Sequence, residues 1–424
     1  MLDAGTHAER PALAGVRVVD WTHVLAGPYA GYLLGQMGAD VIRVERADGG
    51  DITRTTALDE RLGALELGEG FVMQGSGKRS IAIDARDAEA RAALLALIAG
   101  ADVLIENFRP GKLGALGLDP AALIERFPRL VVCSVTGFGQ SGELSGRRAY
   151  DHVIQAASGI MAANRDEAGR PQRIGLPLID YATGMQAALA VVAALHRRAQ
   201  DAVAGVPRTR GEWLDVSMHE VALTISAPAY ASHAVSGIER KASRATAFSG
   251  NPLSGTFDTA AGHLAIVCNT DAQSRAFVSA MRAAGEVATE VDALQAAVAQ
   301  RDVEATHHWI AARLATRSAA DWEAHFRAFE VPAAEVVSPA AAYDRAKGDA
   351  ARWPRVRLDR ADGRIVAVPG PGYGSTAPHP STLAPPPLRG EHGRALLREV
   401  GVDDAAFDAM RARGAVYEPG SVAP

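Results

Sequence analysis

The chain has 424 residues, of which 48% are hydrophobic and 22% are charged, and its formal net charge is −5. This length exceeds what one hydrophobic core usually serves, so we expect roughly two domains of about 100–200 residues each. The charge balance argues against a nucleic-acid-binding protein, and we find no apolar run of the ~18–20 residues that a membrane-spanning helix needs.

Cysteine usage and the first residues indicate where the protein works. Only two cysteines occur, Cys133 and Cys268, and they are far apart in the sequence. We therefore expect a reducing compartment, namely the cytoplasm, and no disulfide framework. The first 15 residues lack a basic start followed by an apolar core, so we expect no secretory signal. Cysteine and histidine are not clustered at ligand spacing, which argues against a structural metal.

A strand–helix–strand unit opens the chain. The apolar stretches Gly15–Asp20 and Asp40–Glu45 are typical of buried strands, and Ala26–Met37 between them is typical of a helix. Three such elements in about 30 residues predict a parallel sheet with right-handed crossovers. The loop Thr22–Pro28 brings small residues and a proline to a helix start, where backbone N–H groups can receive a phosphate or carboxylate. It lacks the GxGxxG pattern, so a redox cofactor is not supported.

The same alternation continues towards residue 225. We expect further strands within Gly75–Asp84, at Ala101–Ile105 and at Leu130–Val135, and a helix at Ala88–Ile98. Two of these strands end in polar or glycine-rich loops, Asn107-Phe108-Arg109 and the stretch TGFGQSG after Val135. Ligands of open parallel sheets bind beyond the carboxyl ends of the strands. The sequence therefore predicts a binding site at that edge.

A lone carboxylate, Asp180, precedes the most apolar helix. After it, apolar residues recur at three- and four-residue spacing through GLPLIDYATGMQAALAVVAALHRR, residues 175–198. Asp180 is thus expected at or just before a helix N-terminus, with no other charge until the basic residues at the helix end. Two interpretations follow from the residues alone. Asp180 either caps the helix, contributing ~1 kcal/mol, or acts as a nucleophile in a site that removes its water.

The pattern of predicted strands and helices changes beyond Ser232. Gly255–Phe257 and Gly262–Cys268 predict a hairpin, and Val331–Val337 predicts a returning strand. Four helices are expected between them, around residues 272–284, 292–300, 303–315 and 320–329. We therefore assign a large domain to residues 1–225 and a small α+β domain to 226–337. Residues 338–424 are proline-rich around 369–387, include a short helix near 393–400 and contain few core residues, so we expect them to return to the large domain or wrap it.

Five stretches occur in an order that is typical of one protein family. They are LAGVRVVDWTHVLAGPYAGYLLGQMGADVIRVERADGGDITR, GKRSIAID, ADVLIENFRPG, SVTGFGQSG and DYATGMQAALAVVAAL. The chain resembles the family III CoA-transferases, which include formyl-CoA, carnitine and bile-acid CoA-transferases and the α-methylacyl-CoA racemases. The resemblance is strong from about residue 13 to 225 and recurs faintly at Arg389–His392.

This resemblance implies a fold, an assembly and a set of substrates. The fold is an α/β Rossmann-like large domain with a parallel sheet, joined to a smaller α+β domain. The assembly is an interlocked homodimer, in which the large domain of one subunit meets the small domain of the other. The implied substrates are CoA or acyl-CoA and a carboxylic acid, with no permanently bound cofactor, metal, nucleic acid or membrane partner.

The resemblance also implies roles for individual residues. Asp180 matches the family's catalytic aspartate. The positions that match CoA contacts are Val24, Leu25, Ala26, Arg46, Met73, Lys78, Asn107, Phe108, Arg148 and Tyr150. Among these, Arg46 is assigned to the nucleotide, and Met73 and Lys78 to the segment bordering the adenosine. Leu25 stands where formyl-CoA transferases have glutamine, which argues against formate or oxalate chemistry.

One position distinguishes a transferase from a racemase. Racemases of this family carry a histidine immediately before the aspartate of the motif that reads Tyr150-Asp151 here. Racemisation needs a proton-transferring group on each face of the α-carbon, and a phenol with an ordinary pKa of ~10 is a poor base. His152 is two residues along a helix and points elsewhere.

We therefore predict a CoA-transferase that uses an acyl anhydride and then an aspartyl-CoA thioester on Asp180. The alternatives are a 2-methylacyl-CoA racemase and a non-catalytic acyl-CoA-binding protein. Basic side chains near the site favour a small dicarboxylate such as succinate as the donor acid. Gly137-Phe138-Gly139 and Ser249-Gly250-Asn251 are the candidate loops for N–H donors to the tetrahedral intermediates.

Overall fold

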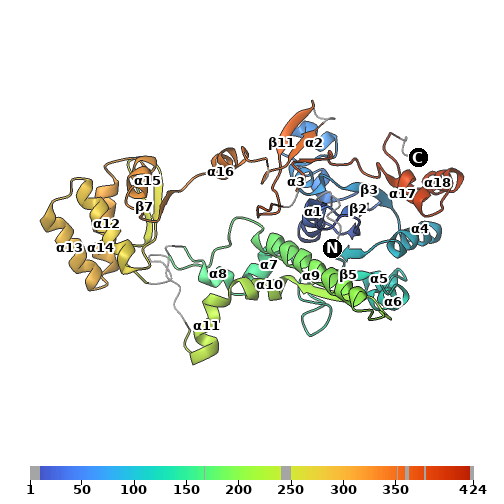
Figure 1. Ribbon diagram of the computed structural model, residues 1–424, viewed down its shortest axis with the longest axis horizontal. Coiled ribbons are helices and arrows are strands. Elements are labelled where there is room, and N and C mark those ends of the chain that lie inside the picture. The colour runs from blue at the N-terminus through green and yellow to red at the C-terminus, as the bar shows by residue number, and fades with distance from the viewer. Residues whose placement is uncertain are drawn as a thin grey trace, which may run out of the picture. The chain divides into compact units, whose positions relative to one another are not determined.

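A computed structural model describes residues 10–166, 168–239, 250–350, 352–358, 362–376 and 379–420. The chain divides into two compact units. The large unit comprises Met1–Ala162, Gln172–Pro228 and Ala346–Pro424, and the small unit comprises Ala163–Pro171 and Ala229–Arg345. The C-terminal segment thus belongs to the same unit as the N-terminal half (Figure 1).

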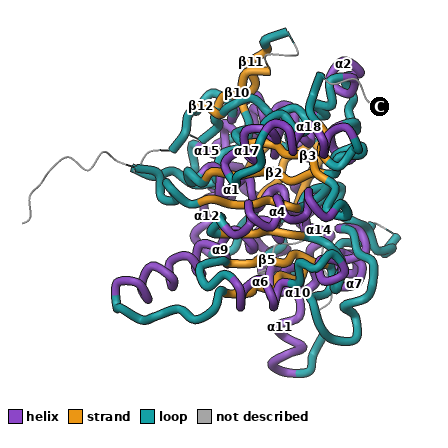
Figure 2. Tube along the Cα trace, turned by 90° about the vertical axis from the view of Figure 1, so that its right-hand side faces the viewer, coloured by secondary structure: helices purple, strands orange, loops and turns teal. Residues whose placement is uncertain are grey.

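A seven-stranded sheet forms the centre of the large unit, in the order β13-β3-β2-β1-β4-β5-β6. Its strands are β1 (Arg17–Trp21), β2 (Asp40–Glu45), β3 (Arg79–Ile83), β4 (Val103–Glu106), β5 (Val131–Thr136), β6 (Glu212–Ser217) and β13 (Val416–Tyr417). The first six run parallel, and only β13 pairs antiparallel, with β3. Figure 2 shows β2, β3 and β5 stacked as orange strands between purple helices. The predicted parallel-sheet domain is confirmed.

Successive residues of each strand face opposite sides of this sheet. In β1, Val18 packs with the helices of one side and Val19 with those of the other. The first side is covered by α1 (Ala26–Gln36), α9 (Leu178–Val203) and α10 (Met218–Ile225). The second is covered by α4 (Ala88–Ala99), α5 (Lys112–Ala115), α6 (Pro120–Arg126), α17 (Gly393–Glu399) and α18 (Asp404–Ala412). The strand order reverses between β1 and β4, which makes the carboxyl ends of these two strands the switch point of the sheet.

Two glycines allow α1 to sit close to its neighbours. A Cβ atom at Gly184 of α9 would lie 2.6 Å from the carbonyl oxygen of Ala26, and one at Gly31 would lie 2.7 Å from the Asp20 carboxylate. Neither distance is compatible with a side chain. The glycines therefore bring the start of α9 against the start of α1, and seat α1 directly on β1.

Helix α9 corrects the expectation that no stretch is long and apolar enough to cross a membrane. Its 26 residues pass that test by length and composition, and no charged residue lies between Tyr181 and Leu195. Its buried residues, including Ala188, Val191 and Ala194, pack against α1 and the sheet. Core helices of soluble proteins pass the same test, so a single helix of this kind is weak evidence for a membrane span.

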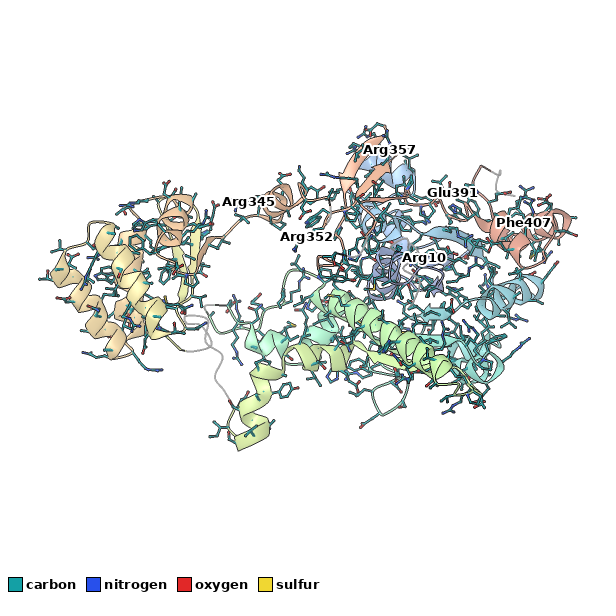
Figure 3. The ribbon with its side chains drawn as sticks, in the orientation of Figure 1. Arg10, Arg345, Arg352, Arg357, Glu391 and Phe407 are labelled. Carbon is teal, nitrogen blue, oxygen red and sulfur yellow. The ribbon has the colours of Figure 1, made fainter. Side chains whose placement is uncertain are left out.

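The C-terminal segment contributes more core than its composition suggested. Strands β10 (Arg355–Leu358), β11 (Arg364–Ala367) and β12 (Thr382–Leu383) form a small sheet. This sheet packs on α2 (Glu60–Ala64) and α3 (Glu69–Gly75), which follow the 3-10 helix η1 (Ile52–Arg54). Leu396, Leu397, Phe407 and Met410 are buried in the main core, and Figure 3 labels Phe407 on α18. The expectation that this segment is poor in core residues is wrong, because apolar residues of α17 and α18 are buried in the main core and those of β10 and β12 in the cluster with α2 and α3.

The small unit is an antiparallel sheet covered by helices. Strands β7 (Gly255–Asp258), β8 (His263–Ile266) and β9 (Ala333–Glu335) pair in that order. The helices are α12 (Asp271–Ala283), α13 (Ala288–Ala299), α14 (Val303–Leu314) and α15 (Ala319–Arg327). Their core includes Phe277, Trp322 and Phe326. The predicted hairpin, four helices and returning strand are thus all present. Helices α8 (Ile160–Ala163), α11 (Ala227–Ser236) and α16 (Pro339–Ala346) lie where the chain passes from one unit to the other.

Candidate active site

The loops that follow β1 and β4 are joined at the switch point of the sheet. The side-chain oxygen of Asn107 accepts the N–H of His23 at 2.9 Å, and its Nδ2 donates to the His23 carbonyl at 2.8 Å. The ring of Phe108 packs edge-on against Trp21 at 5.0 Å and against His23 at 5.2 Å. The structure therefore brings Asn107 and Phe108 to the predicted edge. The amide of Asn107 is engaged by the backbone of the β1–α1 loop (Thr22–Leu25), so it positions that loop.

Val24, Leu25 and Ala26 form the turn from β1 into α1. Val24 has a φ of +67°, and its N–H donates to Asp51 at 3.0 Å. Leu25 is the N-cap residue of α1, and its side chain makes no cap hydrogen bond. The N–H groups in the first turn of a helix have no intrahelical partner. The predicted loop therefore presents a helix N-terminus for which the described residues provide no side-chain acceptor.

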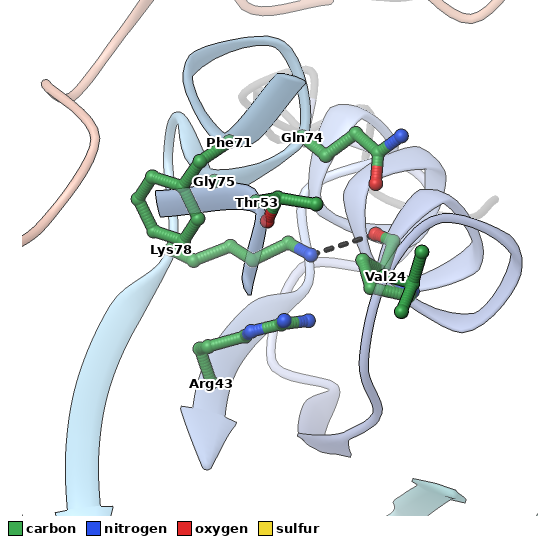
Figure 4. A pocket seen from close by; sticks show the side chains of 8 residues that line it. Val24, Arg43, Thr53, Phe71, Gln74, Gly75 and Lys78 are labelled. Carbon is green, nitrogen blue, oxygen red and sulfur yellow. Dashed lines mark hydrogen bonds between the residues drawn. The ribbon is translucent and has the colours of Figure 1, made fainter. Parts of the chain in front are cut away.

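A buried cluster of charged side chains lies beneath this loop. Lys78 donates to the carboxylate of Asp20 at 2.8 Å and to the carbonyl of Pro28 at 2.7 Å, the contact dashed in Figure 4. Arg43 donates to Asp20 at 3.3 Å and makes a second, closer ion pair with Asp51. Burial lowers the pKa of Lys78 to about 8, although the Asp20 charge opposes the shift.

This cluster places the Lys78 side chain in the interior, and its assignment to the segment bordering the adenosine stays a prediction. Its ammonium is buried and held by Asp20, so it is not an exposed cation at the binding edge. Met73, assigned to the same segment, lies on α3 and is half-buried against the cluster that contains Tyr32 and Phe71. Beside Val24 and Lys78 there is a cavity of about 10 Å³, room for about one water molecule (Figure 4).

Two arginines stand past the carboxyl ends of neighbouring strands. Arg46 follows β2, and its side chain is 64% exposed and paired twice with Asp48 at 3.0 Å. Arg86 follows β3, is similarly exposed, and pairs with Asp84 at 2.8 Å. Asp48 raises the pKa of Arg46, and the positive charge of Arg86 opposes that rise. Arg86 was missed from the sequence, although a cation directly after a predicted strand was the available signal.

The residues before α7 (Asp151–Ala157) are exposed. Arg148 is open to solvent, and Tyr150 is 72% exposed at the N-cap position of α7. His152 is also exposed on α7. Their exposure does not test the assignment of Arg148 and Tyr150 to CoA contacts, which stays a prediction.

Asp180 occupies the first turn of α9, and its side chain does not cap the helix. The N-cap residue is Pro177, and no side chain of α9 itself makes a cap hydrogen bond. Instead, Asp151 of α7 accepts the N–H groups of Ile179 at 2.7 Å and Asp180 at 3.3 Å. The capping interpretation of Asp180 is therefore wrong: a carboxylate 29 residues earlier performs that role.

The environment of the Asp180 carboxylate suits a nucleophile. Among the described residues, none pairs with it or donates a hydrogen bond to it. Burial raises its pKa to about 7, and the carboxylate of Asp151 adds to this effect. Asp180 precedes Gly184 by one turn on the same helix face, and Gly184 packs against Ala26. Asp180 therefore lies towards the N-terminus of α1, where partial positive charge favours an anion.

The candidate oxyanion loops stay predictions. The N–H of Gly139 donates to the hydroxyl of Thr136 at 3.0 Å, so it is already engaged. Ser249 lies outside the described residues. Gly250 and Asn251 belong to the small unit, where the Asn251 side chain accepts the N–H of Leu253.

A family model for CoA-transferase family III matches residues 13–393. The chain belongs to CoA-transferase family III. The family recognised in the sequence is thereby confirmed.

Relatives of this family III chain include enzymes named for dicarboxylates. The succinate–glutarate CoA-transferase of Agrobacterium fabrum is 35% identical over 235 residues, which is 54% of this chain and 56% of that protein. The chain thus spans about half the length of this relative. The succinyl-CoA:glutarate CoA-transferase of Mus musculus is 29% identical over 407 residues, 96% of this chain and 90% of the mouse protein. A CAIB/BAIF family protein from Brucella suis has a crystal structure that matches with a TM-score of 0.73 at 27% identity, covering 92% of this chain and 100% of that one.

Proposed function

We propose that this protein transfers CoA from a small dicarboxylyl-CoA, such as succinyl-CoA, to a carboxylic acid. The observation that carries the proposal is the half-buried, unpaired carboxylate of Asp180 at the start of α9, in a chain of family III. The names of the A. fabrum and mouse relatives support a dicarboxylate donor and acceptor.

In the proposed reaction, Asp180 exchanges acyl groups in four steps. Its carboxylate attacks the thioester carbonyl of the donor, and CoA leaves as the thiolate, which gives a mixed anhydride. The thiolate then attacks the Asp180 carbonyl carbon, forms an aspartyl-CoA thioester and releases the donor acid. The acceptor carboxylate then attacks the aspartyl-CoA carbonyl carbon and displaces the CoA thiolate, which gives a second mixed anhydride. The thiolate attacks the acceptor's acyl carbon, which forms the product acyl-CoA and regenerates the Asp180 carboxylate. Each step is an acyl transfer, so the thioester free energy is not lost to hydrolysis.

An assay with purified protein tests this function. We expect CoA transfer from succinyl-CoA to one or more of glutarate, itaconate and mesaconate, without α-proton exchange in deuterated water. Transfer is expected because each acid offers the carboxylate that the scheme needs. Rapid α-proton exchange of a 2-methylacyl-CoA without transfer would instead support the racemase, and binding of acyl-CoA with neither reaction would support a non-catalytic protein.

Arg46 and Arg86 are proposed to contact the phosphates of CoA. Replacing either with alanine should raise the KM for acyl-CoA by about 3–10-fold and leave kcat nearly unchanged, because the charge acts on bound and reacting substrate alike. Steady-state kinetics at 50 and 300 mM salt would measure this, and the effect should shrink at high salt. Arg61→Ala is the matched control, since Arg61 of α2 is an equally exposed arginine that pairs with Asp59, the N-cap residue of that helix. A kcat effect of Arg86→Ala as large as its KM effect would contradict the assignment.

We also propose that the protein is the interlocked homodimer implied by the family resemblance. Apolar side chains on one helix support this, since Met185 and Leu189 of α9 are 56% and 61% exposed in the single chain. Light scattering on the purified protein tests the assembly, and a monomer at micromolar concentration would exclude it.

A further inference from the structure

The β1–α1 loop contains an unusual backbone conformation. Among the described residues, five non-glycine residues have a positive φ, and Val24 is the only β-branched one. Bulky, β-branched side chains rarely adopt this left-handed region. Such outliers persist only where surrounding contacts impose them, and they occur often at functional sites.

The carboxylate of Asp51 imposes this conformation. Its Oδ2 accepts the Val24 N–H at 3.0 Å, and its Oδ1 accepts the N–H and the hydroxyl of Thr53, both at 2.8 Å. Arg43 holds the same carboxylate in a buried ion pair, in which the two side chains are only 2% and 1% exposed. All of these contacts come from β2 and the segment that follows it, so the loop is anchored to its neighbouring strand.

Side chains from two other segments hold the backbone of this loop by hydrogen bonds. The two hydrogen bonds from Asn107 hold the N–H and the carbonyl of His23. With Asp51, three consecutive polar groups of the backbone are therefore held by side chains from the segments after β4 and β2. Val24 itself borders the small cavity in Figure 4, together with Arg43 and Thr53.

We propose that Asp51 is a positioning residue for CoA transfer. It holds Val24 in the left-handed conformation and thereby fixes Leu25 and Ala26, at the start of α1, beside Asp180. Without that hydrogen bond Val24 relaxes to a negative φ, and the peptide that leads into α1 turns. This inference rests on the proposed function, because the position of the loop matters for the reacting thioester.

The test compares variants at two buried carboxylates. Asp51→Asn should lower kcat by about 10–10²-fold, with a smaller change in the KM for acyl-CoA, because misplacement near the reacting centre acts on the chemical step. Glu45→Gln is the matched control: Glu45 is equally buried, and its hydrogen bonds are made with Arg54 and Ser80, outside the loop. It should keep kcat within about 3-fold of the parent.

A second substitution separates positioning from folding. Glycine adopts a positive φ without strain, so Val24→Gly in the Asp51→Asn background should recover part of the lost kcat. Hydrogen exchange of the peptide containing residues 22–28 should be faster in Asp51→Asn than in the parent or in Glu45→Gln. Equal loss of kcat in Asp51→Asn and Glu45→Gln, or unchanged exchange at Val24, would overturn the inference. An inactive parent would overturn the proposed function instead, which keeps the two failures distinct.

Discussion

Asp180→Asn should reduce CoA transfer from succinyl-CoA by about 10³-fold or more, because an amide cannot form the acyl anhydride. The substitution preserves the shape of the side chain and takes away no hydrogen bond from a described residue. Steady-state kcat measures the loss. Mass spectrometry of the parent, quenched with donor alone, should show an acyl or CoA adduct on the peptide containing Asp180, and the variant should show none.

The same substitution should leave the fold intact and change how stability depends on pH. In the folded protein the pKa of Asp180 is raised to about 7 from an ordinary value of 3.8. A carboxyl group whose pKa is raised on folding contributes stability below its unfolded pKa, and this contribution is lost as pH rises through the folded pKa. Between pH 4 and 7 the parent should therefore lose stability that Asp180→Asn does not lose. Thermal unfolding at pH 5 and pH 8 measures the difference.

A carboxylate at the other end of the same helix provides the control. Asp201 of α9 pairs with Arg208 at 3.1 Å and lies far along the helix from Asp180. Asp201→Asn should therefore keep kcat within about 2-fold of the parent. If Asp180→Asn retains full turnover between two acids, the proposed chemistry is wrong, whatever the fold.

Local sequence patterns predicted the elements that position the site. Apolar runs ending at Asp20 and Glu45 became β1 and β2, and the helix expected from Ala26 begins at that residue. Because parallel strands end at one edge, the sequence also placed Asn107 and Phe108 beside the β1–α1 loop. These predictions depend on periodicity and on a rule of sheet topology, both of which act over short stretches of chain.

The features of the site that the sequence could not predict depend on contacts between segments that are distant in the sequence. Lys78 lies in a polar turn in the sequence, yet its ammonium is buried against Asp20, 58 residues earlier. Nothing near Asp180 shows that Asp151 caps α9, because the two residues meet only when α7 packs beside α9. The left-handed Val24 is likewise imposed by Asp51, from the segment after β2. The residue pattern within one segment gives no information about contacts with residues of a distant segment.

Asp151→Ala should lower kcat by about 10–10²-fold through the position of Asp180. The alanine removes the acceptor for the N–H groups of Ile179 and Asp180, so the first turn of α9 loses its only side-chain cap among the described residues. Loss of such a cap costs about 0.5–2 kcal/mol of stability. Urea denaturation measures that cost, and kinetics at saturating substrate measure the loss of rate.

Asp151→Asn separates the charge of Asp151 from its hydrogen bonds. The asparagine oxygen can still accept the Ile179 N–H, while its NH₂ group faces the side-chain nitrogen of Gln155, which donates to Asp151 at 2.5 Å in the parent. The cap is therefore kept at some cost in stability, but the negative charge that helps raise the pKa of Asp180 is removed. Because Asp180 reacts as the carboxylate, kcat of the parent should rise with pH up to about 7.

In Asp151→Asn this rise should move to lower pH, since a weaker negative field favours ionisation of Asp180. The ratio of variant to parent kcat should then be higher at pH 6 than at pH 8, because only at the lower pH does the variant hold more of Asp180 in its reactive form. A structural defect alone would lower both values by the same factor. An identical midpoint in the two pH profiles would show that Asp151 acts on Asp180 through the backbone of α9 and not through its charge.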